Sequence, residues 1–501
     1  MRLLDLPPEI LDLIIDRTLP HGIESFVLSC KAVHRRATSQ IERHNALKQR
    51  WRRTTNVSPI RRGDTLSIIR EIAREPQIAH YIQSLDLWEW RVKSPVSSSH
   101  DDDDFRNHAD TMETIKTLLR STEYFAKTDL ESWWENMLQE DRANDDDHLD
   151  KLYATIALLA LLPNLQTLQL PDRWHEVRNT EAGEGLVPAI EAMVALANAE
   201  GHQQKPLAGL HTIFPFVEEG YDVRVGLQCL QPFMTLKSLK NLYAVSCVAI
   251  DEDWLGLTFH WPNPSIKSSL TRIEFASCCM NAGGLAHLLP NTTNLAIFRY
   301  SHQTKWDGLE HDWNPGELLE ILANYCSETL TELAITIDEL HGEIENGLSS
   351  FMRLPHLSKL EVDVQAFCGP PLESGQRLGR NARVPPGQDP WTYLDIPCMG
   401  DMLPPSVREL HVNTDFPEPA EQALRSLFKN IVDRRKDKLI LLQKVVIRQY
   451  RSTSAKVMAD EHAVILEGFD EGVENPRPRS MMPQWKREFD ATVGGIVSAD
   501  D

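Results

Sequence analysis

The sequence lacks the long apolar run that a membrane-spanning helix requires. No stretch of its 501 residues approaches the ~18 consecutive apolar residues of such a helix. Aspartate and glutamate also interrupt the N-terminus, where a secretory signal peptide would have an unbroken apolar segment. We therefore expect no membrane association, and we predict a location in the cytoplasm, the nucleus or both.

The eight cysteines lack the spacing of a metal site or of a disulfide framework. None of them forms a CxxC pair, and eight in 501 residues are few for a disulfide-stabilised protein. We interpret them as buried thiols in a reducing compartment.

Recognisable catalytic motifs are also missing. The sequence has no Gly-x-Ser-x-Gly, no phosphate-binding Gly-Lys-Ser/Thr loop and no GxGxxG after a strand. His175-Glu176 begins a zinc-protease-like pair, but the second histidine is absent. His302, His311 and Asp312 lie close in sequence without a further ligand pattern. We predict no catalytic residue, no cofactor and no metal, and an unrecognised α/β enzyme is a less favoured alternative.

Charge is distributed unevenly along the chain. The net charge is −21, yet residues 1–62 carry twelve Lys and Arg against six Asp and Glu. The acidic remainder disfavours nucleic acid as a ligand because it would repel a polyanion. We interpret the basic segment 31–62 as a solvated helix face that favours an acidic partner, with a nuclear import signal as an alternative.

The first thirty-six residues hold more apolar surface than so small a unit can bury. Pro7-Pro8 followed by Glu9 predicts the start of a helix that runs from Pro8 to Arg17. Its apolar residues cover roughly 200°, whereas one buried face needs about 100°; they are Ile10, Leu11, Leu13, Ile14 and Ile15. We therefore expect part of this arc to bind another protein.

Two more helices are predicted from the apolar spacing that follows. The second would place Ile23, Phe26, Val27 and Cys30 on one face, and the third would place Val33, Ala37, Ile41 and Trp51 on or near one face.

Residues 3–40 resemble the F-box, a three-helix motif that joins a substrate receptor to a cullin-RING ubiquitin ligase. The family signature stands here as Leu6-Pro7-Pro8-Glu9-Ile10, and a second block as Val27-Leu28-Ser29-Cys30-Lys31. The chain departs from the pattern at Val33 and His34, near the position of a frequent aromatic residue. The resemblance implies that a Skp-family adaptor binds Leu6, Pro7, Glu9, Ile10, Leu11, Ile14, Leu28 and Cys30. An ordinary N-terminal helical hairpin is the alternative.

Past residue 80 the sequence shows a loose leucine-rich repeat. Segments 239–247 and 270–278 follow the pattern L-x-x-L-x-L-x-x-N/C, with cysteine in the last position. Other segments keep only the apolar spacing: Ile82/Leu85/Leu87, Leu165/Leu168/Leu170, Leu295/Ile297, Leu330/Leu333/Ile335, Leu357/Leu360/Val362, Val407/Leu410/Val412 and Leu442/Val445/Ile447. Helices are predicted between them at 282–289, 317–325 and 420–434, so each unit is a strand followed by a helix.

We therefore predict an α+β or α/β solenoid, in which a three-helix F-box precedes an irregular leucine-rich-repeat-like domain. The predicted parts are the F-box at 1–48, a helical linker at 49–80, the repeat domain at 81–450 and a partly flexible tail at 451–501, in which Trp485 and Phe489 can anchor a last turn. Insertions are expected at about 91–150, with acidic runs around a Trp133-Trp134 helix, and at 366–402, rich in Pro and Gly. An unrelated α/β domain with Leu-rich strands is the alternative.

The resemblance implies a non-catalytic receptor that holds an unknown protein target while other subunits transfer ubiquitin. Strand residues between the leucines point away from the core. We predict that they bind the target, through Asn241, Tyr243, Arg272, Glu274, Lys359, Glu361 and His411. A merely solvated sheet face, and a repeat scaffold without a ligase role, are the alternatives.

Overall fold

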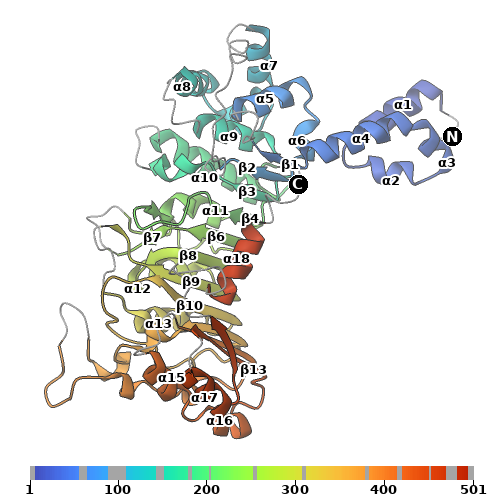
Figure 1. The fold of residues 1–501 in the computed structure, drawn as a ribbon. Coiled ribbons are helices and arrows are strands. Elements are labelled where there is room, and N and C mark those ends of the chain that lie inside the picture. The colour runs from blue at the N-terminus through green and yellow to red at the C-terminus, as the bar shows by residue number, and fades with distance from the viewer. Residues whose placement is uncertain are drawn as a thin grey trace. The chain divides into compact units, whose positions relative to one another are not determined.

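The computed structural model divides into two compact units (Figure 1). The first comprises residues 1–216 with 236–238, and the second comprises residues 217–235 with 239–501. The structure describes residues 6–55, 65–88, 109–142, 152–178, 183–201, 205–251, 257–306, 312–377, 383–414, 420–450, 453–469 and 482–494.

Four helices form the N-terminal part of the first unit. They are α1 (Pro8–Arg17), α2 (Ile23–Val27), α3 (Lys31–Arg36) and α4 (Thr38–Trp51). Helix α1 begins and ends at the predicted residues. The helices enclose a small apolar core of Leu11, Ile15, Ile23, Val27, Val33 and Ala37.

The predicted three-helix motif is wrong, because the expected third helix is divided at Ala37. This residue has φ −82° and ψ 7°, outside helical geometry. The Thr38 hydroxyl donates to the Arg35 carbonyl at 3.0 Å, and a continuous helix would use that carbonyl for its next turn. As a result α3 and α4 are separate helices. The second half of α4 leaves the small core and buries His44 and Trp51.

The rest of the first unit places helices around four short parallel strands. The strands pair in chain order as β1 (Arg53–Thr55), β2 (Ser84–Asp86), β3 (Thr167–Gln169) and β4 (Thr212–Phe214). The helices are α5 (Thr65–Arg74), α6 (Ile78–Tyr81), α7 (Ala109–Arg120), η4 (Phe125–Lys127), α8 (Leu130–Arg142), α9 (Leu152–Leu161), η5 (Asp172–Arg178) and α10 (Gly183–Asn198). Every residue of α9 is buried, in keeping with a sequence that is apolar apart from Thr155 and the Tyr153 hydroxyl.

The first predicted insertion is only partly described. Trp133 and Trp134 of α8 are both buried, so the predicted helix around them packs into this unit. The acidic runs at 101–104 and 145–147 lie outside the described residues.

The second unit is built on a longer parallel sheet. Its strands pair in the order β6 (Asn241–Val245), β8 (Arg272–Met280), β9 (Ile297–Gln303), β10 (Glu332–Glu339), β11 (Lys359–Asp363), β12 (Glu409–Asn413), β13 (Lys444–Tyr450) and β14 (Ile465–Phe469). A side ladder joins β5 (Val225–Gly226) and β7 (Cys247–Ala249) to β8. The apolar anchors are in register, since Leu360 pairs with Leu333 on one side and Leu410 on the other.

Helices of the second unit connect these strands. They are η6 (Leu227–Leu230), α11 (Gln231–Met234), α12 (Ala282–Leu288), η8 (Leu289–Asn291), α13 (Pro315–Cys326), η10 (Val364–Phe367), η11 (Leu372–Ser374), η12 (Tyr393–Asp395), α14 (Met399–Met402), α15 (Ala420–Phe428), α16 (Ile431–Asp437), α17 (Thr453–Glu461) and α18 (Gln484–Gly494). Figure 1 shows α18 along one side of the sheet and α12 and α13 on the other.

The predicted fold class is therefore wrong. The described residues form an α/β fold with fourteen parallel strands and helices, without a three-helix F-box. The predicted apolar anchors do fall on or beside strands. Their uneven spacing lies in the connections, because parallel strands tolerate crossovers of different length while the paired residues stay in register. Within the described ranges, no helix is both long and apolar enough to cross a membrane.

Candidate functional site

Large apolar side chains remain exposed on α1 and just after α2. Ile10 is 43% exposed, Leu13 58% and Leu28 79%, whereas Leu11 and Ile15 of α1 are buried in the small core. Helix α1 therefore buries only part of its apolar arc, as its width predicts.

The other predicted adaptor-binding residues surround these side chains in different states of exposure. Pro7 and Glu9 are exposed, and Leu6, Ile14 and Cys30 are half-buried. The Cys30 sulfur also has a structural role, because it accepts the backbone N–H of Val33 at 3.5 Å and caps α3. Of the predicted set, only Leu11 belongs to the buried core of the helices.

A bidentate ion pair fixes α3 to α1 beside this surface. The Arg36 guanidinium donates to both carboxylate oxygens of Asp12, at 2.6 and 2.7 Å. These hydrogen bonds lower the pKa of Asp12, so the pair is charged at neutral pH. The exposed apolar residues are therefore displayed by helices that are held together independently of them.

Several predicted target-binding residues lie under α18. The Tyr243 ring is buried, with its centroid 5.9 Å from that of Phe489. Lys359 donates to Glu488 at 3.2 Å. The Glu361 carboxylate accepts the backbone N–H groups of Gln484 and Trp485 at the start of α18, at 2.6 and 3.0 Å.

The remaining predicted residues pair with neighbours on the same sheet face. Arg272 donates to Glu274 at 2.6 Å, and Glu274 is only 1% exposed. His411 lies 2.6 Å from Glu409. Asn241 is half-buried on β6. The face thus carries the predicted residues, but α18 already covers its centre.

A buried lysine on α18 was missed by sequence reasoning. The Lys486 ammonium lies 3.0 Å from Asp338 and 2.9 Å from Glu219, and its side chain is 4% exposed. Burial opposes this charge, but the two carboxylates outweigh it and raise the pKa of Lys486. Burial likewise opposes the charge of Asp338, yet Lys486 and two serine hydroxyls lower its pKa. Both partners are therefore charged in the folded protein.

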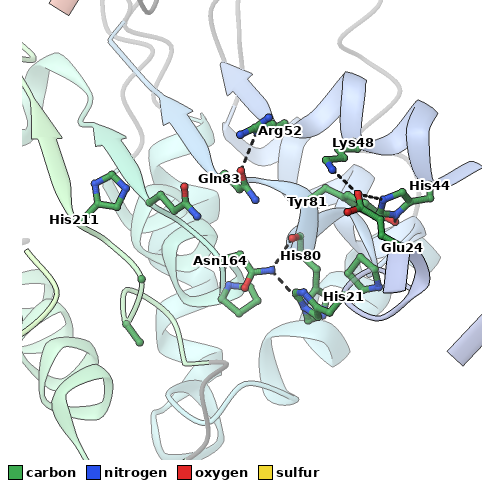
Figure 2. Close-up of a pocket in the computed structure, with 15 residues that line it drawn as sticks. His21, Glu24, His44, Lys48, Arg52, His80, Tyr81, Gln83, Asn164 and His211 are labelled. Carbon is green, nitrogen blue, oxygen red and sulfur yellow. Dashed lines mark hydrogen bonds and ion pairs between the residues drawn. The ribbon is translucent and has the colours of Figure 1, made fainter. Parts of the chain in front are cut away.

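A polar cavity of about 480 Å³ lies within the first unit (Figure 2). Each of the strands β1 to β4 contributes the residue immediately before it: Arg52, Gln83, Gln166 and His211. The rest of the lining comes mainly from α2, α4, α6 and adjoining loops: Pro20, His21, Glu24, His44, Lys48, His80, Tyr81, Pro163, Asn164, Ala208 and Gly209. Because neighbouring parallel strands start at one edge of the sheet, residues far apart in sequence meet here.

One wall of the cavity is a chain of hydrogen bonds that joins α4 to α2 and α6. The Glu24 carboxylate lies 2.5 Å from the Lys48 ammonium and 3.2 Å from His44 Nε2, and these contacts lower the pKa of Glu24. Burial raises the pKa of Tyr81 to about 12, so its hydroxyl remains protonated, and it lies 2.9 Å from His44 Nδ1. The ionised Glu24 carboxylate can only accept, so the proton between it and His44 is on Nε2.

Two further histidines and an amide form the adjoining wall (Figure 2). His21 Nε2 lies 3.4 Å from His80 Nδ1, and Asn164 donates to the His80 carbonyl at 2.7 Å. Burial, followed by the nearby His21, lowers the pKa of His80, so His80 is neutral at pH 7. Neutral imidazoles each offer one N–H donor and one acceptor.

The residues considered as metal ligands in the sequence do not gather. His302 is buried and stacks on Trp313 with ring centroids 4.3 Å apart, and His311 lies outside the described residues. Over the described ranges, no group of three His, Cys, Asp or Glu side chains is placed to hold a metal ion.

No protein-family model matches the chain, and no curated protein shows significant sequence similarity to it.

Proposed function

We propose that this protein is a non-catalytic substrate receptor of a cullin-RING ubiquitin ligase. In this proposal, α1 and the segment after α2 bind a Skp-family adaptor. The main support is the exposure of Ile10, Leu13 and Leu28 beside the Leu6-Pro7-Pro8-Glu9-Ile10 sequence. Complete burial of one such side chain contributes about 1.5–3 kcal/mol, so three together suit the apolar centre of a protein interface.

The exposed positions can be changed without disturbing the small helical core. The core residues lie on other faces of the helices, and the Arg36–Asp12 pair joins α3 to α1 separately. Loss of binding in a surface variant can therefore be distinguished from loss of folding.

The first prediction concerns the double variant Ile10→Ala/Leu28→Ala. Truncating two interface anchors should weaken adaptor binding by at least ~2 kcal/mol, or roughly 30-fold. Co-purification with a Skp-family adaptor, followed by an affinity measurement, checks this. The circular dichroism spectrum should match that of the unchanged protein.

A matched control for the Ile10 substitution is available in the second unit. Ile266 is 40% exposed, close to the 43% of Ile10, so Ile266→Ala removes the same atoms from a surface of similar exposure. It should leave adaptor binding unchanged. Equal affinity of the double variant and the unchanged protein would refute the adaptor site, and a chain that never binds the adaptor would favour a scaffold without a ligase role.

Because α18 covers the centre of the predicted sheet face, the target-binding surface is to be sought elsewhere. Reversing Arg272 or Lys359 to glutamate would place like charges beside Glu274 or Glu488, which are their present partners. Such variants would disturb the sheet face itself. We therefore propose that the target binds the Pro-rich segment 383–397, a proposal supported by the exposure of Val384, Tyr393 and Leu394, which are 41%, 36% and 76% exposed.

A further inference from the structure

We propose that the cavity at the starts of β1 to β4 binds a small molecule carrying a phosphomonoester. This is a ligand-binding function separate from adaptor binding. The cavity volume of about 480 Å³ lies in the usual range of small-molecule sites, about 300–1,000 Å³. It exceeds what a lone phosphate ion needs, so it leaves room for the organic part of the ligand.

The row of residues before the strands supplies hydrogen-bond donors on one side. Arg52, Gln83, Gln166 and His211 occupy equivalent positions on four adjacent strands. Arg52 uses its Nε to donate to the Gln83 side-chain oxygen at 3.0 Å. Among the described residues, neither terminal nitrogen of Arg52 has a hydrogen-bond partner. A guanidinium with its two terminal nitrogens available matches two oxygens of a phosphate group.

The charge balance of the lining favours an anion. Glu24 is its one carboxylate, and Lys48 and His44 already engage it. Its negative charge is therefore compensated and repels an entering anion only weakly, while the charge of Arg52 remains available. A phosphomonoester carries about −1.5 to −2 at neutral pH and three acceptor oxygens, which suits a wall of cationic and neutral donors.

The histidine wall can complete the coordination of the phosphate. His21, His80 and Asn164 lie together on the other side of the cavity (Figure 2). Both Asn164 N–H groups face partners, the His80 carbonyl and His21 Nε2, so the amide positions the histidines, and an imidazole N–H can donate to a phosphate oxygen without adding a fixed charge. The apolar surfaces of Pro20, Pro163 and Ala208 are left to contact the organic part of the ligand.

Calorimetric titration of the full chain with glycerol 2-phosphate at pH 7 tests this proposal. We expect saturable binding, and no binding of glycerol, which has the same organic part without the phosphate. Arg52→Gln should weaken binding about 10- to 100-fold, the range of a hydrogen bond to a charged group. Arg53→Gln is the matched control, because Arg53 is the next residue and does not line the cavity; it should bind like the unchanged protein.

A second variant tests the cavity with Arg52 unchanged, so its result does not depend on a contribution of Arg52 to folding. Gln166 is exposed, and Gln166→Glu adds a carboxylate to the cavity without removing a buried group, so it should also weaken binding. Absence of glycerol 2-phosphate binding, unchanged affinity in Arg52→Gln and Gln166→Glu, or equal weakening by Arg53→Gln would each overturn the proposal. The last result would indicate non-specific attraction to the basic segment. Adaptor binding should be the same in all these variants, so the two proposals fail separately.

Discussion

At Lys486 a charged side chain is held in the interior by two carboxylates. Asp338 lies on β10, 148 positions before Lys486 in sequence. Removing one partner of a buried ion pair leaves the other charge uncompensated, which is far more costly than removing a surface pair. This residue therefore provides a sensitive test of how α18 is held.

The prediction at this scale is that Lys486→Met lowers the free energy of unfolding by about 3–5 kcal/mol. Urea denaturation of the full chain measures the change. The double variant Lys486→Met/Asp338→Asn should be less destabilised than the sum of the single variants, because it removes both buried charges. Additive effects would show that the pair does not act as a unit.

At the scale of elements, α18 acts as a cover for one sheet face. Its two aromatic side chains, Trp485 and Phe489, are 0% and 3% exposed. The Trp485 ring N–H donates to the Thr336 hydroxyl at 3.1 Å, and Glu361 accepts the first backbone N–H groups of the helix. The hydrogen bonds between α18 and the sheet thus provide partners for polar groups of both.

Ending the chain after residue 482 should therefore destabilise the second unit. Re-exposing two buried aromatic side chains costs about 3–6 kcal/mol in total, at about 1.5–3 kcal/mol each, and leaves Asp338 without its lysine. A chain that ends after Gly494 is the control, because it retains all of α18. The two chains are compared by their urea unfolding midpoints. Identical midpoints would show that α18 adds no stability.

The sequence predicted individual elements better than their junctions. Proline at the start and the apolar spacing placed α1 correctly. The break between α3 and α4 was missed because Ala37 is a good helix former, and the cause is a side-chain hydrogen bond from Thr38 that periodicity does not reveal. The sequence likewise predicted a single helix at 420–434, where the structure has the two helices α15 and α16.

At the scale of the whole molecule, the sequence predicted the features that depend on local patterns and missed those that depend on long-range contacts. Leu360 and Leu410 could be placed on strands because each sits in a local apolar pattern. The cavity could not be predicted, since its histidines come from positions 21, 44, 80 and 211 and meet only through the packing of helices and strands in the folded unit. The burial of Tyr243 could not be predicted either, because it depends on contact with Phe489 of α18, which is far away in the sequence.

The apolar surface on α1 and after α2 carries the proposed role of this protein, and adaptor binding tests it most directly. We expect calorimetric titration of the full chain with a purified Skp-family adaptor to show one-to-one binding with a Kd of about 1 µM or lower, equivalent to about −8 kcal/mol. The heat-capacity change should be negative, because Ile10, Leu13 and Leu28 would become buried. Absence of binding heat at several temperatures, together with elution of two separate proteins on size-exclusion chromatography, would contradict the proposal.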